Sequence, residues 1–153
     1  MRYTIQILLT AFLIMMASCQ NSGTEPVGGS DAELIQAIID ADEPMAIRLY
    51  ITSDLITSER MANSTRDGFV RSTDGNIAPI EDKIEELIKA FKDDIEEGDV
   101  FDLVYTPEAG VTVYKDGDVE SSVQGLAFKK ALFGIWLSDN PIQKSLRKAL
   151  VNR

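Results

Sequence analysis

The sequence predicts an α+β domain in which helices cover one face of an antiparallel sheet. Three observations predict this class. Two segments alternate apolar and polar residues with the two-residue period of a strand, an Asp-Gly pair joins two further short strands, and the other segments repeat apolar residues at helical spacing. Apolar faces of these two kinds are buried by packing against each other.

The first part of this domain is predicted to hold one helix and one strand. The helix begins at Asp31, which can cap it, and ends near Asp42. Four apolar residues recur in it at helical spacing: Leu34, Ile35, Ile38 and Ile39. Residues 45–52 then alternate as a strand with one buried face, with Ile47, Leu49 and Ile51 on one side and Ala46, Arg48 and Tyr50 on the other.

Two helices are predicted to follow this strand. The first runs from Thr57 to about Val70. Its apolar side carries Met61, Thr65 and Phe69. The second begins at Pro79, which fits the first turn of a helix, and repeats apolar residues against an acidic outer face as far as Ile95.

The last part of the domain is predicted to be a three-stranded meander followed by two helices. Residues 100–105 alternate as a strand, and residues 111–115 and 118–123 form a hairpin around the tight turn Asp116-Gly117. Residues 125–137 are apolar nearly all round, which predicts a largely buried helix. A final helix follows Pro141 and runs to about Val151.

The N-terminus has the pattern of a bacterial lipoprotein signal. Arg2 precedes the apolar run 7–16, and the small residues Ala17 and Ser18 come just before Cys19, the only cysteine. We therefore expect residues 1–18 to be a signal peptide and Cys19 to carry the lipid. Residues 19–30, rich in Gly and Ser, would then form a flexible tether for a domain at 31–153.

Lipidated Cys19 predicts attachment to a membrane of the bacterial cell envelope. Gln20 stands where an inner-membrane retention signal of the enterobacterial kind has Asp, so the outer membrane, facing the periplasm, is the expected location.

Composition excludes several function classes. The net charge is −10, so nucleic acid is not an expected partner. The chain has no histidine, which excludes Ser-His-Asp and Cys-His catalysis and removes the most common transition-metal ligand. We expect no metal and no cofactor. The oligomeric state stays open.

The second half of the chain carries the strongest family signal. Gly125, Phe128, the pair Trp136-Leu137 and Pro141 follow the meander in an order that resembles the chalcone isomerase-like family. Residues 47–69 look like its bacterial exported branch, and the resemblance extends from about Ala32 to the C-terminus. It implies an open-faced β-sandwich, and either a plant-type isomerase that closes a chalcone to a flavanone or a non-catalytic protein that binds fatty acids.

The chain departs from this family in one respect. Family members have several strands before the segment that matches Ala32, and the expected fold lacks them. The arginine that the resemblance would assign to a ligand carboxylate belongs to those strands. No catalytic residue is therefore assigned, and Arg48, Tyr50 and Tyr105 are the candidate ligand-binding residues because they could line one concave surface of the sheet.

Three functions stay open at this point. The first is a membrane-anchored, non-catalytic lipoprotein that binds a fatty acid or another apolar small molecule. The second is an intramolecular lyase of the chalcone isomerase type, in which Arg48 and Tyr50 stabilise the developing enolate. The third is a cell-envelope interaction module that pairs through an open sheet edge.

Overall fold

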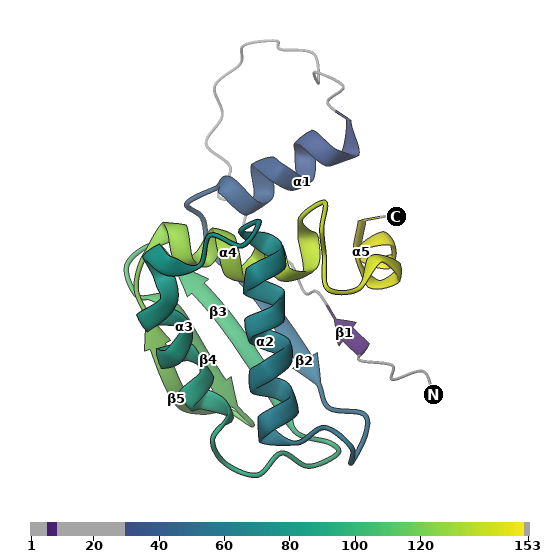
Figure 1. The fold of residues 1–153 in the computed structure, drawn as a ribbon, viewed down its shortest axis with the longest axis vertical. Coiled ribbons are helices and arrows are strands. Elements are labelled where there is room, and N and C mark those ends of the chain that lie inside the picture. Colours follow the sequence, from purple (N-terminus) through teal and green to yellow (C-terminus); the bar gives the residue numbers. More distant parts are fainter. Residues whose placement is uncertain (1–5, 9–29, 152–153) are drawn as a thin grey trace, which may run out of the picture.

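One antiparallel sheet forms the base of the fold. The computed structural model describes residues 6–8 and 30–151. The sheet order is β1-β2-β3-β4-β5, and all neighbouring strands are antiparallel (Figure 1). The strands are β1 (Gln6–Leu8), β2 (Met45–Tyr50), β3 (Val100–Thr106), β4 (Gly110–Lys115) and β5 (Asp118–Val123). The predicted meander is thus confirmed, and β1 lies within the segment expected to be a signal peptide.

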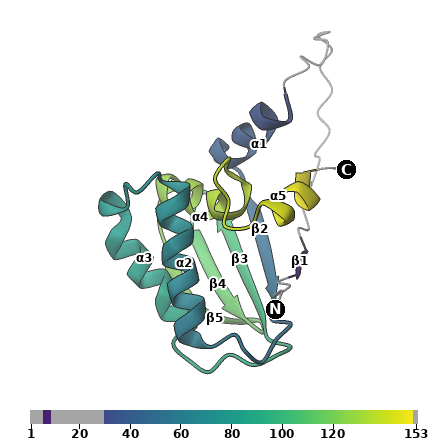
Figure 2. The same cartoon turned by 45° about the vertical axis from the view of Figure 1, so that its right-hand side comes forward.

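Helices cover one face of this sheet, as predicted. They are α1 (Asp31–Asp40), α2 (Ser58–Ser72), α3 (Glu81–Ile88), α4 (Leu126–Leu137) and α5 (Lys144–Val151). Single 3₁₀ turns precede and follow α3. In Figures 1 and 2, α2 and α3 lie across the same face of β2–β5, and α4 lies between that layer and α1.

The alternation of β2 and β3 determines which side chains enter the core. Leu49 of β2 lies opposite Phe101 of β3, and Ile47 lies opposite Leu103. All four side chains are buried beneath the helices. The residues that alternate with them lie on the open face, such as Arg48 of β2 and Asp102 of β3, which are opposite each other. The sheet is therefore one-sided, with the main core on its helix-covered face. A second, small cluster of buried apolar residues lies between α1 and α4.

Local sequence explains the helix ends and the hairpin. Ser30, rather than Asp31, caps α1: its Oγ accepts from the N–H of Glu33, while the Glu33 carboxylate accepts from the N–H of Ser30 at 2.7 Å. Asp31 is the first helical residue, so the predicted cap was wrong by one position. Asp116 and Gly117 both have positive φ, as a type I′ hairpin turn requires.

The predicted long helix from Pro79 to Ile95 is shorter in the structure. α3 ends at Ile88, and after the 3₁₀ turn Lys89–Phe91 the chain is irregular. Ile95 is nevertheless buried in the core. Ile95 is therefore buried without being part of a helix, because the irregular segment between Phe91 and β3 itself packs into the core.

Lys129 is a fully buried lysine on α4 that joins this helix to α1. Its ammonium donates to the carbonyl oxygens of Ile38, Ile39 and Ala41, at 3.1, 2.8 and 2.8 Å. These are carbonyls at the C-terminal end of α1, which lack partners within the helix. An ammonium has three N–H donors, so Lys129 is fully satisfied, and it supplies positive charge at the negative end of the α1 dipole.

The surroundings of Lys129 are apolar and aromatic. Its Nζ lies 5.5 Å from the ring centre of Tyr105 and 5.7 Å from that of Phe133. Desolvation lowers the pKa of Lys129 below its ordinary value. The carbonyl cage and the two ring faces act in the opposite direction, because both favour the charged ammonium.

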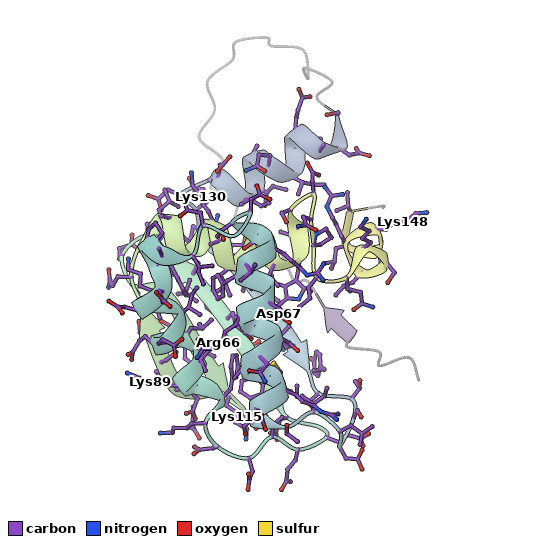
Figure 3. All side chains as sticks on the ribbon, in the orientation of Figure 1. Arg66, Asp67, Lys89, Lys115, Lys130 and Lys148 are labelled. Carbon is purple, nitrogen blue, oxygen red and sulfur yellow. The ribbon has the colours of Figure 1, made fainter. Side chains whose placement is uncertain are left out.

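Replacement of Lys129 tests this link between α4 and α1. We expect Lys129→Met to lower the free energy of unfolding by about 2–4 kcal/mol, because three carbonyls lose their donor inside the protein. The matched control is Lys130→Met at the next residue, which is labelled in Figure 3 and forms only a partly exposed ion pair with Asp40. It should cost less than about 1 kcal/mol.

Urea unfolding of the two variants, followed by circular dichroism, provides the measurement. Equal losses in the two variants would contradict a special role of the buried lysine.

Candidate functional site

An apolar cavity lies between the helices and the sheet. It has a volume of about 60 Å³. Leu49 and Leu103 of the sheet form its floor, and α2, α4 and the segment before α5 form its walls. Among the described residues that line it, only Ser64 and Thr65 are polar, and none is charged. The lining is therefore compatible with hydrocarbon, and within the described residues it offers no ion to pair with a charged group.

Two helices approach each other closely beside this cavity. A Cβ atom built at Gly68 of α2 would lie 2.7 Å from Cγ2 of Ile135 on α4. Only glycine lets the two helices pack at this distance without a shift. Ile135 also lines the cavity, so the side chain that packs on Gly68 is part of the cavity wall.

The cavity opens between α2 and the segment that joins α4 to α5. Ser64 is exposed, and Trp136 and Ile142 are half-buried. The N–H of Ile142 donates to the carbonyl of Ile135 at 2.8 Å, which holds this segment against α4. Among the described residues, this short connection and the half-buried Trp136 side chain lie between the interior and solvent on that side.

The three aromatic residues of α4 have different positions. Phe128 and Phe133 are fully buried in the core, which agrees with the expected packing role. Trp136 lines the cavity. The sequence did not distinguish among these residues, because an apolar helix gives no signal for the side on which space remains.

Arg48 and Tyr50 lie on the open face of the sheet, away from the cavity. Arg48 donates from Nε and Nη2 to the two carboxylate oxygens of Asp102, at 2.6 and 2.9 Å. Hydrogen bonds to Asp102, then to Tyr50, raise the pKa of Arg48 above its ordinary value. The guanidinium is thus paired within the sheet. Ligand binding by these two residues stays a prediction.

Tyr105 lies on the opposite face, so the expectation that it shares one surface with Arg48 and Tyr50 is wrong. Its side chain is 2% exposed. The reason is its position in β3: Tyr105 has the same parity as Phe101 and Leu103, and these point into the core. Its hydroxyl donates to Oδ1 of Asp42 at 2.5 Å. This hydrogen bond, together with burial, raises the pKa of Tyr105 to about 12.

The described part of the chain has neither a metal-binding cluster nor a membrane-spanning helix. Within residues 6–8 and 30–151, no group of three or more acidic, cysteine or histidine residues could hold a metal ion. No helix in these ranges is long and apolar enough to cross a bilayer. Cys19 lies outside the described residues, so its predicted lipidation has no structural test.

Comparisons with known proteins match the fold described above. A family model described as chalcone isomerase-like matches residues 30–152. Among solved structures, a fatty-acid binding protein of Arabidopsis thaliana is similar at a TM-score of 0.66 and 18% sequence identity, over 83% of this chain and 67% of that chain. At this identity the similarity demonstrates a shared fold. No relative was found among curated proteins.

The hydrogen bond of Tyr105 predicts a loss of stability at alkaline pH. Because the folded-state pKa is raised above the unfolded value, the contribution is complete below about pH 10 and is lost as pH rises towards 12. We expect Tyr105→Phe to lower the free energy of unfolding by about 1–2 kcal/mol at about pH 8, and this difference from the parent to shrink by about pH 11.5.

Urea unfolding at both pH values measures the effect, with Tyr114→Phe on the open face as control. If the stability difference between Tyr105→Phe and the parent stays constant with pH, the predicted loss of the Tyr105–Asp42 contribution at alkaline pH is refuted.

Proposed function

The chain belongs to the chalcone isomerase-like family, and from this premise we propose that it is a non-catalytic binding protein for an apolar chain, such as the acyl chain of a fatty acid. The observation that carries the proposal is the apolar cavity between α2, α4 and the sheet. The similar Arabidopsis structure is named a fatty-acid binding protein, which supports a ligand of this class.

Binding requires the cavity to widen. Its volume of about 60 Å³ is well below the roughly 300–1,000 Å³ of typical ligand pockets. The segment at Ile142 and the side chain of Trp136 are the walls that border solvent, so their displacement is the expected route of entry. Each methylene that enters contributes about 0.8 kcal/mol, which favours long hydrocarbon chains.

The position of charge supports binding without catalysis. Closing a chalcone ring requires a cation or strong donors at the developing enolate oxygen. Arg48, the sequence-based candidate for this role, is paired with Asp102 on the face of the sheet opposite the cavity. In the part of the chain that the structure describes, the cavity lining contains two hydroxyl-bearing residues and no cation. Among these residues a lyase function has no charged electrophile at the place where an apolar substrate would bind.

The location of the protein is a second part of the proposal. The pattern before Cys19 supports cleavage after Ser18 and lipidation of the thiol, which would hold the domain at the outer membrane, facing the periplasm. Several acyl chains on one residue give stable anchoring, whereas one chain gives only marginal binding. A binding domain tethered in this way would meet lipids released from the bilayer.

Trp136 provides a direct test of ligand binding, because it is the only tryptophan in the sequence. Titration with palmitic acid should produce a saturable change in Trp136 fluorescence. Thr65→Phe, which fills the cavity from α2, should weaken binding at least tenfold. The control Asn63→Phe places the same side chain on the exposed side of α2 and should bind like the parent.

A fluorescence signal that does not saturate, or equal binding by the two phenylalanine variants, would refute binding in this cavity.

Lipidation is tested separately in cells. Labelling with an alkyne-bearing fatty acid should mark the parent chain, and the Cys19→Ser variant should be unlabelled and leave the membrane fraction. The neighbouring variant Ser18→Ala keeps a small residue before the cysteine and should still be labelled. Labelling of Cys19→Ser at the parental level would exclude the proposed anchor.

A further inference from the structure

An exposed apolar groove runs between α1 and α5, on a different part of the molecule from the cavity. It has a volume of about 200 Å³. Leu34 and Ile38 of α1 border it and are 55% and 53% exposed. Leu150 and Val151 of α5 border it from the other side. Figures 1 and 2 show α1 projecting from the layer of α4, with α5 beside it.

The exposure of Leu34 and Ile38 follows from how α1 is held. Ile35 and Ile39 are buried against Leu137 of α4. Leu34 and Ile38 come one residue earlier in each turn, so they lie on an adjacent stripe. The other described residues leave this stripe largely exposed. Within the described residues, Leu34 and Ile38 are two of only five large exposed apolar side chains. Such a paired patch is typical of an interaction surface.

The two helices that border this groove carry opposite charge. α1 contains Asp31, Glu33 and Asp40 and no basic residue. α5 contains Lys144, Arg147 and Lys148 and no acidic residue.

Some of these charges already have partners in the fold. Asp40 pairs with Lys130 of α4, and Arg147 pairs with Asp139. In the part of the chain that the structure describes, no ion pair is made by Asp31, Lys144 or Lys148. In Figure 3, Lys148 extends from the outer side of α5. We call the charged residues of α1 the acidic border and those of α5 the basic border. Each border therefore keeps charge that can attract the opposite border of another molecule.

We propose that this surface binds a second copy of the same chain in a two-fold symmetric dimer. In this arrangement α1 of each protomer packs its Leu34–Ile38 stripe on Leu150 and Val151 of its partner. The acidic border of one protomer then meets the basic border of the other. A two-fold axis forms this contact twice, so the surface is complementary to itself.

A second copy fits the surface better than a membrane does. The chain has a net charge of −10, and anionic lipid would repel the acidic border that surrounds Leu34 and Ile38. The helices are about 15 Å and 12 Å long by their residue numbers, so two reciprocal crossings provide a continuous interface.

Co-purification of two differently tagged full-length chains tests the dimer. The chains are coexpressed and extracted in mild detergent at low salt. Parent chains should co-purify, and Leu34→Glu in both chains should reduce the recovered partner at least fivefold, because it places a charge in the apolar contact. Absence of co-purification between parent chains would overturn the proposal and leave the groove to a different partner.

Charge reversal distinguishes this interface from any other. Lys144→Glu with Lys148→Glu makes the α5 border acidic. Asp31→Lys and Ala37→Lys, combined with Glu33→Gln, make the α1 border basic, because the one acid that remains in α1, Asp40, is paired with Lys130. Glutamine at position 33 can still serve the helix cap. All five positions are exposed. Each variant should fail to pair with itself, because both contacts then join like charges. When the two variants are coexpressed, both contacts join opposite charges, and co-purification should return to the parental level.

The control is Lys89→Glu with Lys92→Glu, which changes the net charge as much as the α5 variant does. Lys89 lies on the far side of the molecule from Lys148 in Figure 3. This control should co-purify like the parent. Self-pairing by either border variant, or failure of the mixed pair to recover, would overturn the proposed arrangement.

Discussion

Enclosure of α4 is the constraint on which the rest of the fold depends. This helix is apolar nearly all round, so most of its surface needs a cover. The sheet, α2 and α1 supply this cover. One charged residue, Lys129, lies inside the enclosure. An ammonium group is tolerated there only where acceptors bind its N–H donors and nearby groups offset its charge. The C-terminal carbonyls of α1 provide that compensation, which fixes the position of a helix that buries few side chains of its own.

The same constraint explains both hollows of the molecule. α2 approaches α4 closely at Gly68, where Ile135 packs, and Ile135 also lines the apolar cavity. α1 is held at its C-terminal end by Lys129 and along the side of Ile35 and Ile39, so the other described residues leave its neighbouring stripe of Leu34 and Ile38 exposed. A cavity in the interior and an apolar groove at the surface therefore arise from the way that α4 is surrounded.

Sequence reasoning succeeded where local periodicity determines structure and failed where distant contacts do. The alternation of β3 was clear, yet the face occupied by Tyr105 was misjudged. Its parity with Phe101 was the available signal, whereas its partner Asp42 lies 63 residues away and has no local signature. Lys129 has no distinguishing signal in the sequence of its helix. Its burial depends on the end of α1, some 90 residues earlier in the chain, which no pattern within the helix could indicate.

The separation of charge from apolar space limits what the domain can do chemically. Catalysis of a charge-forming reaction requires polar groups fixed beside the reacting atoms, because only there do they favour the transition state over the ground state. In the described residues the guanidinium of Arg48 is neutralised on the open face, and the cavity holds only hydroxyls at its mouth. A ligand there would gain free energy in proportion to the hydrocarbon it buries, with its polar end left near exposed Ser64 in water. Under the proposed function, such a site would select for the length and shape of an apolar chain.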